Sequence, residues 1–268
     1  MTTPFDDIRT LFAQFPERAP APPAPPAPDA FSAIAGWILQ WRGAARLNRP
    51  ILCVYAGAHA GGDIGPTRAR MEALAAGEAA VNRALSSLGA GLDVFDLALE
   101  RPVADPALGA AMSERECAAT MAFGMEALAK QPDLLILMGI GPGADEAAGD
   151  LAKALAEDDS DPLSLLRQWG GRETAALAGA ILAARIQGVP ALLDGAPALA
   201  AAAVLHALDP DAIAHCRIAH APNAPASHAL AARLGAEPLL GLQIDLEDGT
   251  AAVATLSIVK LAVAVAGG

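Results

Sequence analysis

Runs of consecutive hydrophobic residues recur along this chain, and each run ends in glycine or a polar residue. Because the runs are continuous rather than alternating, they predict strands that are covered on both faces, as in parallel sheets. The four clearest runs and one shorter candidate are RPILCVYAGAH (49–59), GLDVFDLAL (91–99), DLLILMGIG (133–141), VPALLDG (189–195) and HCRIAHA (215–221).

Segments with helical spacing of apolar residues separate these predicted strands. We expect helices over 31–43, 66–88, 113–130 and 226–235, the one over 66–88 being long. Two more helices lie on either side of Gly170-Gly171, another ends at Leu208, and a terminal helix runs from 249 onward. Strand and helix therefore alternate, which favours an α/β fold: a Rossmann-like three-layer sandwich with a mostly parallel sheet. We expect the two termini to add a small helical subdomain.

Two parts of unequal size are predicted along the chain. Residues 1–30 form an N-terminal arm, which contains the amphipathic piece FDDIRTLFAQF and then APAPPAPPAP. The Pro/Ala tract cannot form a helix interior, so it is an extended spacer, or alternatively an arm that wraps a partner subunit. Residues 31–268 form a single α/β domain.

The composition narrows the class of protein further. Of the 268 residues, 54% are hydrophobic and only 4% aromatic, so the core is built mainly from Ala, Leu, Val and Ile. The net charge of −12 excludes the basic surface that nucleic acids require, and it argues against an anionic membrane surface. In the apolar C-terminal stretch, Lys260 lies in the middle, which favours a buried or interface helix over a membrane span.

The number and spacing of the cysteines indicate a reducing compartment. The three of them, Cys53, Cys117 and Cys216, show no CxxC spacing, and the chain starts without a secretory signal pattern. We therefore expect a cytoplasmic protein. His215, Cys216, His220 and His228 also lack metal-ligand spacing, so we expect no metal site.

A glycine-rich turn follows the third predicted strand, with Gly139, Gly141 and Gly143 before a helix. Glycines let a backbone approach a ligand, and the helix N-terminus offers N–H groups to a phosphate. Asp145 and Glu146 would repel that phosphate, so a tight structural turn is an alternative. The turn also matches a relaxed dinucleotide fingerprint, which leaves a nucleotide-dependent oxidoreductase as a further alternative.

Three more segments combine polar residues with glycine or proline. LEDGTAA places Asp248, Gly249 and Thr250 before the terminal helix, where Asp248 is either a helix cap or a general base. HAPNAPAS starts at His220 after the fifth predicted strand. AGAHAG puts His59 at the exit of the first strand, where a lone histidine is more often an ordinary surface or cap residue.

The stretch DPLSLLRQWGGRETAALAGAILAARIQGVPALLDG, ending at Asp194-Gly195, resembles the nicotinate-nucleotide–dimethylbenzimidazole phosphoribosyltransferases of cobalamin lower-ligand synthesis. The similarity extends from about Pro50 to Ala254. It implies a homodimer that transfers the phosphoribosyl group of nicotinate mononucleotide to 5,6-dimethylbenzimidazole or a related base, forming α-ribazole phosphate, without a metal or cofactor.

The resemblance also implies roles for individual residues. Asp248 would be the general base, at the position of the glutamate in the family's LGEGTGA. The three glycines Gly139, Gly141 and Gly143 would cradle phosphate. The remaining substrate-binding candidates are Asp194, Gly195, His220, His59, Gly249 and Thr250.

Several departures from the family pattern fall on the chemistry. The family's GEMGIGNTT has an acidic residue where this chain has Leu137, and its general base is one methylene longer than Asp248. Its HRSAEPGH has a second histidine where this chain has Ser227. The segment 156–161 is shortened to EDDS, and Glu247 offers a longer carboxylate one position from Asp248. The alternative function is therefore a non-catalytic paralogue that acts as a binding or assembly partner.

Overall fold

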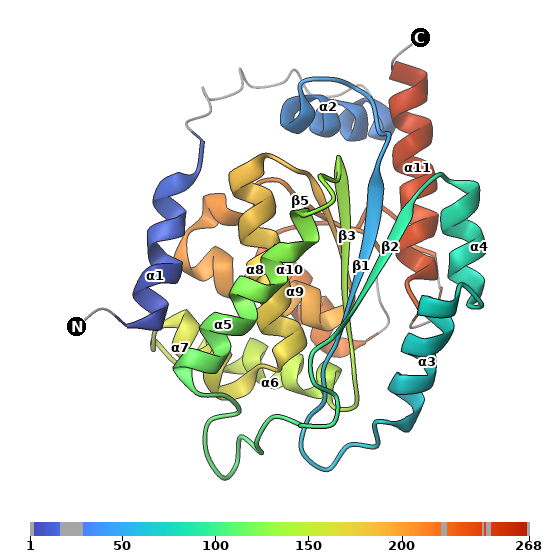
Figure 1. Cartoon of the computed structure of the whole chain (residues 1–268). Helices are drawn as coiled ribbons and strands as arrows, with labels where there is room; N and C mark the ends of the chain where they lie inside the picture. The colour runs from blue at the N-terminus through green and yellow to red at the C-terminus, as the bar shows by residue number, and fades with distance from the viewer. Residues whose placement is uncertain (1–2, 17–28, 221–223, 243, 245–247, 267–268) are drawn as a thin grey trace.

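In the residues that the structure describes, five parallel strands form one sheet in the order β2-β1-β3-β4-β5 (Figure 1). The structure is a computed structural model, and it describes residues 3–16, 29–220, 224–242, 244 and 248–266. The strands are β1 Pro50–Ala56, β2 Gly91–Asp96, β3 Leu134–Ile140, β4 Ala191–Asp194 and β5 Cys216–Ile218. All five were predicted from the hydrophobic runs.

The strand order creates a crevice at one edge of the sheet. From β1 the chain moves outward to β2, and then crosses back to build β3, β4 and β5 on the other side. Loops that leave the carboxyl ends of β1 and β3 therefore diverge, and open α/β sheets bind ligands at such a point. In register, Ala56 pairs with Ile140 and Met138 pairs with Asp194, so these strand ends lie next to one another.

Helices cover both faces of the sheet, as a three-layer sandwich requires (Figure 1). On one face lie α2 Ala30–Arg42, α3 Gly65–Ala76, α4 Ala80–Ser87 and α11 Thr250–Ala266. On the other lie α1 Pro4–Thr10, α5 Glu114–Gly124, α6 Ala144–Glu157, α7 Pro162–Trp169, α8 Arg172–Gln187, α9 Gly195–Leu208 and α10 Pro225–Leu234. The short 3-10 helices are η1 Leu11–Gln14, η2 Met125–Leu128 and η3 Pro210–Ile213.

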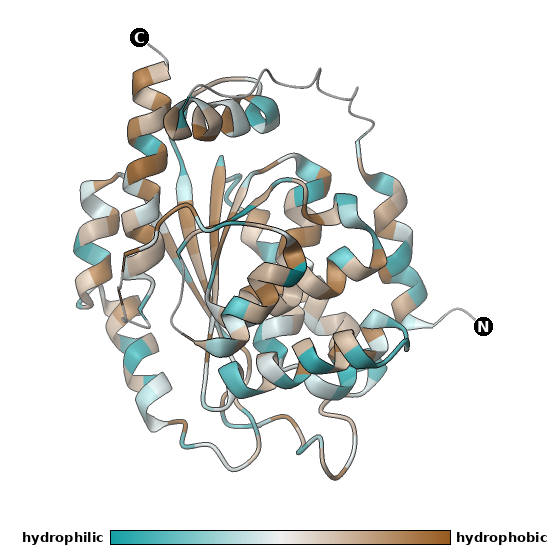
Figure 2. Cartoon of the chain, turned by 180° about the vertical axis from the view of Figure 1, so that it is seen from behind, coloured by the Kyte–Doolittle hydropathy of each residue, from teal (hydrophilic) through white to brown (hydrophobic). Residues whose placement is uncertain are grey.

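The continuous hydrophobic runs have a direct explanation in this arrangement. Along β1, Cys53 and Tyr55 enter the core on one face of the sheet, while Leu52 and Val54 enter the core on the other. Successive side chains of a strand point to opposite faces, so a strand covered twice must be apolar at every position. The strands are correspondingly hydrophobic over most of their length (Figure 2).

The prediction of one helix over 66–88 is wrong. The chain forms α3 and α4 instead, separated at Gly77. Gly77 has a φ of +77°, and it ends α3 by donating its N–H to the carbonyl of Leu74. A left-handed residue cannot continue an α-helix, and glycine adopts this conformation without steric cost.

The helices from the two ends of the chain lie in different layers. In α1, Phe5 and Ile8 are buried in the core on the α5 side of the sheet, whereas α2 packs against α11 on the opposite side. The Pro/Ala tract between α1 and α2 lies outside the described residues. On either side of that tract, the rings of Phe15 and Trp41 both stack on the guanidinium of Arg185, at 4.6 and 5.2 Å.

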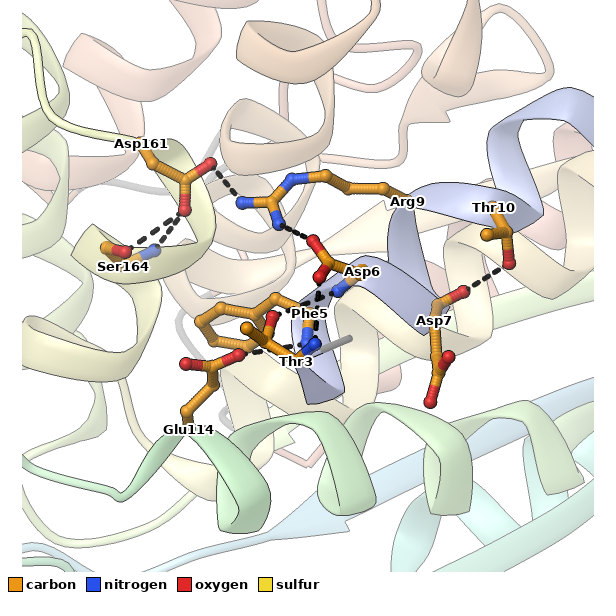
Figure 3. Close-up of polar contacts among 9 residues, drawn as sticks. All are labelled: Thr3, Phe5, Asp6, Asp7, Arg9, Thr10, Glu114, Asp161 and Ser164. Atoms are coloured by element: carbon orange, nitrogen blue, oxygen red, sulfur yellow. Dashed lines mark hydrogen bonds and ion pairs between the residues drawn. The ribbon is translucent and has the colours of Figure 1, made fainter. Parts of the chain in front are cut away.

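A close contact joins α1 to the start of α7 (Figure 3). Arg9 donates to Asp161 at 2.8 Å, and Asp161 also caps α7 by accepting from the backbone and hydroxyl of Ser164 at 3.0 and 3.1 Å. The backbone N–H of Phe5 donates to Glu114 at 3.1 Å. Residues 3–10 are therefore tied to the body of their own chain.

The terminal helix α11 is largely apolar on all sides, with Leu261 and Val265 exposed near its end. Lys260 donates to the backbone carbonyl of Leu88, which gives its charge a polar contact beside α4. Among the described helices, none is long and apolar enough to cross a membrane.

Candidate functional site

A cavity of about 370 Å³ opens at the carboxyl edge of the sheet, within the range of roughly 300–1,000 Å³ typical of small-molecule sites. The ends of β3 and β4 form its floor. The first turns of α3, α6, α9, α10 and α11 contribute to its walls. It therefore occupies the crevice that the strand order creates.

Five of the residues singled out from the sequence line this cavity. They are Gly139, Gly141, Asp194, Gly195 and His220, which come from three different connections of the fold. The other five, Gly143, His59, Asp248, Gly249 and Thr250, are not part of the lining. Leu137, singled out in the sequence before the glycine turn, is fully buried in the core on the α8 side of the sheet.

The glycines of the turn after β3 are required by packing against the loop after β1. A Cβ on Gly141 would lie 2.0 Å from the carbonyl oxygen of Gly57, and a Cβ on Gly143 would lie 2.9 Å from the Cβ of His59. Side chains at these positions would push the two loops apart. Packing of the turn therefore explains why residue 143 is a glycine. It also explains the glycine at 141, although Gly141 lines the cavity as well.

His59 forms a buried ion pair beneath this turn. Its Nε2 lies 3.0 Å from Oε1 of Glu173, whose side chain is fully buried at the start of α8. Burial lowers the pKa of His59, but the charge and hydrogen bond of Glu173 outweigh it, so the pKa is raised. His59 is therefore held as a partner of Glu173 behind the cavity wall.

Glu173 is a residue that sequence reasoning missed. A Cβ on Gly57 or on Gly171 would lie 2.1 Å from its carboxylate oxygens, so the surrounding backbone is built closely around this side chain. Its Oε2 has no hydrogen-bond partner among the described residues. The available signal was a single acidic residue in an otherwise small and apolar helix, and the sequence could not reveal that its partner is His59.

The carboxylate of Asp194 lies at the end of β4, and only 9% of the residue is exposed. Burial raises the pKa of this carboxyl to about 6, with the nearby His220 opposing the rise and the charge of Asp248 adding to it. Across the cavity, His220 contacts the carbonyl oxygen of Leu242 through Nε2, and its backbone pairs with Leu240. These contacts fix the orientation of its ring.

Asp248 lies two residues before the first residue of α11 and is half-buried. Its Oδ1 accepts a hydrogen bond from the backbone N–H of Thr250 at 2.9 Å, which is a capping contact. Gly249 has a φ of +86° and packs so closely on Leu52 that a Cβ would lie 2.9 Å from that side chain. Glu247, the other carboxylate considered in this segment, lies outside the described residues.

Helix N-termini at the cavity lack side-chain caps. Residues of the first turns of α3, α6, α9 and α10 line the cavity, and none of these four helices has a capping side chain. Of the helices that begin elsewhere, α1, α2, α5 and α7 are each capped by Thr, Asp or Ser, whereas α4 and α8 have no side-chain cap. Uncapped N–H groups and the helix dipole both favour an anionic ligand.

Four further charged or polar residues line the cavity, and sequence reasoning missed two of them, Asp63 and Arg70. Asp63, Arg70 and Asp145 add charge to the wall, and Ser227 adds a hydroxyl from the first turn of α10. Ser227 is 1% exposed, and its Oγ has no hydrogen-bond partner among the described residues. No local pattern in the sequence marks Asp63 and Arg70, because the fold brings them to the cavity from a separate segment.

Comparison with known proteins identifies the family. A family profile described as Phosphoribosyltransferase matches residues 30–160 and 149–268. A nicotinate-nucleotide–dimethylbenzimidazole phosphoribosyltransferase of Sinorhizobium sp is 42% identical over 315 residues, covering 97% of this chain and 93% of its own length. The chain belongs to the nicotinate-nucleotide–dimethylbenzimidazole phosphoribosyltransferase family. The protein of the same name from Brucella canis is 40% identical, and the alignment covers 97% of this chain and 93% of that protein.

A solved structure of the family agrees with the fold. The crystal structure of the Thermus thermophilus enzyme of this name aligns with a TM-score of 0.81 over 97% of this chain and 94% of that chain. The sequence identity to that chain is 23%, so this similarity shows the shared fold alone. The α/β architecture predicted from the sequence is thereby confirmed.

This member of the family is shorter than its relatives within the matched region. The Sinorhizobium alignment extends over 315 positions, whereas 97% of this chain is about 260 residues, so about 55 positions have no residue here. The two profile matches overlap at 149–160, which places the shortened segment near the link between α6 and α7. That link lies at the end of α6 opposite the cavity.

The part of the chain that the structure describes contains no cluster of three or more His, Cys, Asp or Glu residues suited to a metal ion. The cysteines Cys53, Cys117 and Cys216 are all unpaired and buried. Burial raises the pKa of the Cys117 thiol to about 12, so this thiol remains protonated near neutral pH.

Proposed function

We propose that this chain transfers the phosphoribosyl group of nicotinate mononucleotide to 5,6-dimethylbenzimidazole or a related base, forming α-ribazole phosphate for cobalamin synthesis. The relatives from Sinorhizobium and Brucella carry the name of this activity, and their similarity extends over nearly the whole chain. The cavity at the switch point of the sheet supports the proposal, because open α/β sheets bind their ligands at such a point.

The single observation that carries the proposal is the meeting of four helix N-termini without side-chain caps at one cavity. A phosphoribosyl donor brings a phosphate, and N–H groups at helix starts bind phosphate without a lysine. The start of α10 suits it best, because that first turn has no acidic residue and presents the buried hydroxyl of Ser227. Asp145 and Glu146 make the start of α6 less favourable.

The reaction also needs a proton acceptor. A benzimidazole attacks through the lone pair of one ring nitrogen and loses the proton of the other. The family resemblance gives this task to the position of Asp248, and we retain Asp248 as a required carboxylate beside the start of α11. No metal or redox cofactor enters the proposed reaction.

Calorimetric titration with each substrate tests the binding part of this proposal. We expect heat on adding nicotinate mononucleotide, and a weaker affinity in Ser227→Ala. Ser257→Ala serves as the matched control, because Ser257 lies on α11, donates to the carbonyl of Ala254 and is not among the described residues that line the cavity. An absence of binding by either substrate to the wild-type chain would contradict the proposal.

A second candidate function is a non-catalytic paralogue that binds a partner protein. The specific observations in its favour are the roughly 55 absent positions and the fully buried Leu137 in place of a family carboxylate. Binding of nicotinate mononucleotide without product would favour this candidate.

The proposal also includes a cytoplasmic homodimer with active sites near the interface. Two observations support it: the sparse, unpaired cysteines suit a reducing compartment, and Leu261 and Val265 expose apolar surface on α11. Sedimentation of the purified chain should give twice the mass of the 27.0 kDa subunit. A monomer at micromolar concentration would contradict the dimer.

A further inference from the structure

The charged groups on the cavity wall are mostly negative. Asp63, Asp145 and Asp194 contribute carboxylates, and Arg70 is the one lysine or arginine among the described residues that line the cavity. The proposed substrate, nicotinate mononucleotide, carries two anionic groups: a phosphate and a carboxylate on the pyridine ring. An anionic group that leaves water needs a cation or hydrogen-bond donors in its place, so each of the two groups requires its own partner here.

Arg70 lies in the second turn of α3, and its backbone is held firmly. Pro66, Thr67 and Arg70 all line the cavity, and their spacing places them on one face of the helix. Next to Arg70, Met71 packs against the core, and Leu74 is buried in it. The half-buried side chain of Arg70 therefore starts from a fixed point in the cavity wall.

Arg70 and Ser227 reach the cavity from opposite layers of the fold. The helix α3 packs in the core on the face of the sheet that also holds α11, whereas α10 packs in the core on the other face (Figure 1). A mononucleotide carries its phosphate and its pyridine ring at opposite ends of the ribose. If the phosphate binds at the start of α10, the ring and its carboxylate are on the side of the cavity that α3 forms.

The backbone at the start of α3 is itself poorly suited to a phosphate. The N–H of Gly65 donates to Oδ1 of Asp63 at 2.9 Å, and Pro66 has no N–H to offer. A carboxylate at a helix start already satisfies the helix dipole and repels a second anion. What α3 offers to an anion is therefore the guanidinium of Arg70, whose planar N–H fork matches a planar carboxylate.

We propose that Arg70 binds the carboxylate of the pyridine ring and so selects nicotinate mononucleotide over nicotinamide mononucleotide, which has an uncharged amide at that place. This inference rests on the proposed function. The two nucleotides share the phosphate, the ribose and the charged ring nitrogen, so they differ only in the group that meets Arg70. With the amide, the guanidinium loses a partner of opposite charge, and specificity follows from that difference in affinity.

The test measures the affinity for each nucleotide by calorimetry at pH 8. It compares the wild-type chain with Arg70→Gln, with Arg70→Lys and with the control Arg68→Gln. Arg68 lies on the same helix, but its side chain is 43% exposed, pairs with Glu100 and is not part of the described cavity lining. Thermal melting verifies that each variant is folded.

The wild type should bind nicotinate mononucleotide roughly 10-fold or more tightly than nicotinamide mononucleotide, because a hydrogen-bonded charge pair is lost with the amide. Arg70→Gln should weaken binding of nicotinate mononucleotide by roughly 10-fold or more and change the affinity for nicotinamide mononucleotide by less than about threefold. Arg70→Lys should retain an intermediate preference, since it keeps the charge without the fork. Arg68→Gln should match the wild type.

Three results overturn the inference while leaving the proposed function in place. The first is a wild type that binds both nucleotides equally well. The second is an unchanged affinity of Arg70→Gln for nicotinate mononucleotide. The third is an equal loss of affinity for both nucleotides in Arg70→Gln, which would make the shared phosphate the partner of Arg70. If the wild-type chain binds neither nucleotide, the proposed function fails and the inference fails with it.

Discussion

The imidazole of His59 and the carboxylate of Glu173 lie 3.0 Å apart, although the residues are 114 positions apart in the sequence. One comes from the loop after β1 and the other from the first turn of α8. The pair thus ties the loop that supports the glycine turn of the cavity to the helix layer behind it. Because both side chains are buried, the loss of either partner leaves the other without compensation.

Replacing Glu173 with alanine should therefore lower the free energy of unfolding by about 3–5 kcal/mol. Glu173→Gln should lose less, because its amide oxygen can still accept from His59. Urea unfolding at pH 7 measures both changes. Glu157→Ala, at the exposed end of α6, is the control and should remain within about 0.5 kcal/mol of the wild type. Equal stabilities for Glu173→Ala and Glu157→Ala would show that the pair does not hold the loop.

The raised pKa of Asp194 predicts a pH-dependent cost in stability. An aspartate titrates near 4 when unfolded and near 6 here, so the folded chain binds more protons between these values. Its contribution to stability is therefore greatest below about pH 4 and is lost as the pH rises through 6, at most about 3 kcal/mol in all.

Asp194→Asn removes this titration, so at pH 7.5 the variant should melt a few degrees above the wild type. The advantage should shrink as the pH falls toward 4. Melting curves at several pH values provide the measurement. A variant that melts below the wild type at pH 7.5 would contradict the placement of Asp194 as a buried carboxylate without a donor.

Gly141→Ala should disturb both the fold and the cavity. The new Cβ would lie 2.0 Å from the carbonyl oxygen of Gly57, so the turn after β3 has to move away from the loop after β1. We expect a loss of at least about 1–3 kcal/mol in unfolding free energy and a weaker affinity for nicotinate mononucleotide. Gly36→Ala is the control: it lies inside α2 with open space around it, and alanine there should be neutral or stabilising. Similar behaviour of the two variants would contradict the close packing of these loops.

The N-terminal helix should contribute stability through its apolar side chains rather than its surface charge. Phe5 is 3% exposed, so Phe5→Ala should cost about 3–5 kcal/mol. Arg9→Ala removes a partly exposed ion pair with Asp161 and should cost less than about 1 kcal/mol. Denaturant unfolding compares the two. If Phe5→Ala lowers the free energy of unfolding as little as Arg9→Ala does, residues 4–10 do not pack on their own chain in solution.

The strands could be predicted because burial on both faces leaves a continuous apolar run in the sequence. In 66–88, by contrast, the apolar spacing continues across Gly77, and only the left-handed conformation of that residue separates α3 from α4. Local pattern therefore sufficed for the elements but not for this break.

For the site, sequence patterns located the strand ends that meet at the cavity, including Gly139, Asp194 and His220. They could not show that His59 forms an ion pair with Glu173, because that pair depends on how the loop after β1 packs against the start of α8. Asp63 and Arg70 were missed for the same reason. Asp248 remains a prediction as a catalytic residue, and its capping contact with Thr250 is a local feature that the sequence did suggest.

The most direct test of the proposed function is to incubate the purified wild-type chain with nicotinate mononucleotide and 5,6-dimethylbenzimidazole and to analyse the products by chromatography and mass spectrometry. We expect α-ribazole phosphate and free nicotinate in equal amounts, with both absent when either substrate is omitted. Unchanged substrates after prolonged incubation with folded protein would rule out the proposed transferase activity and favour the non-catalytic paralogue.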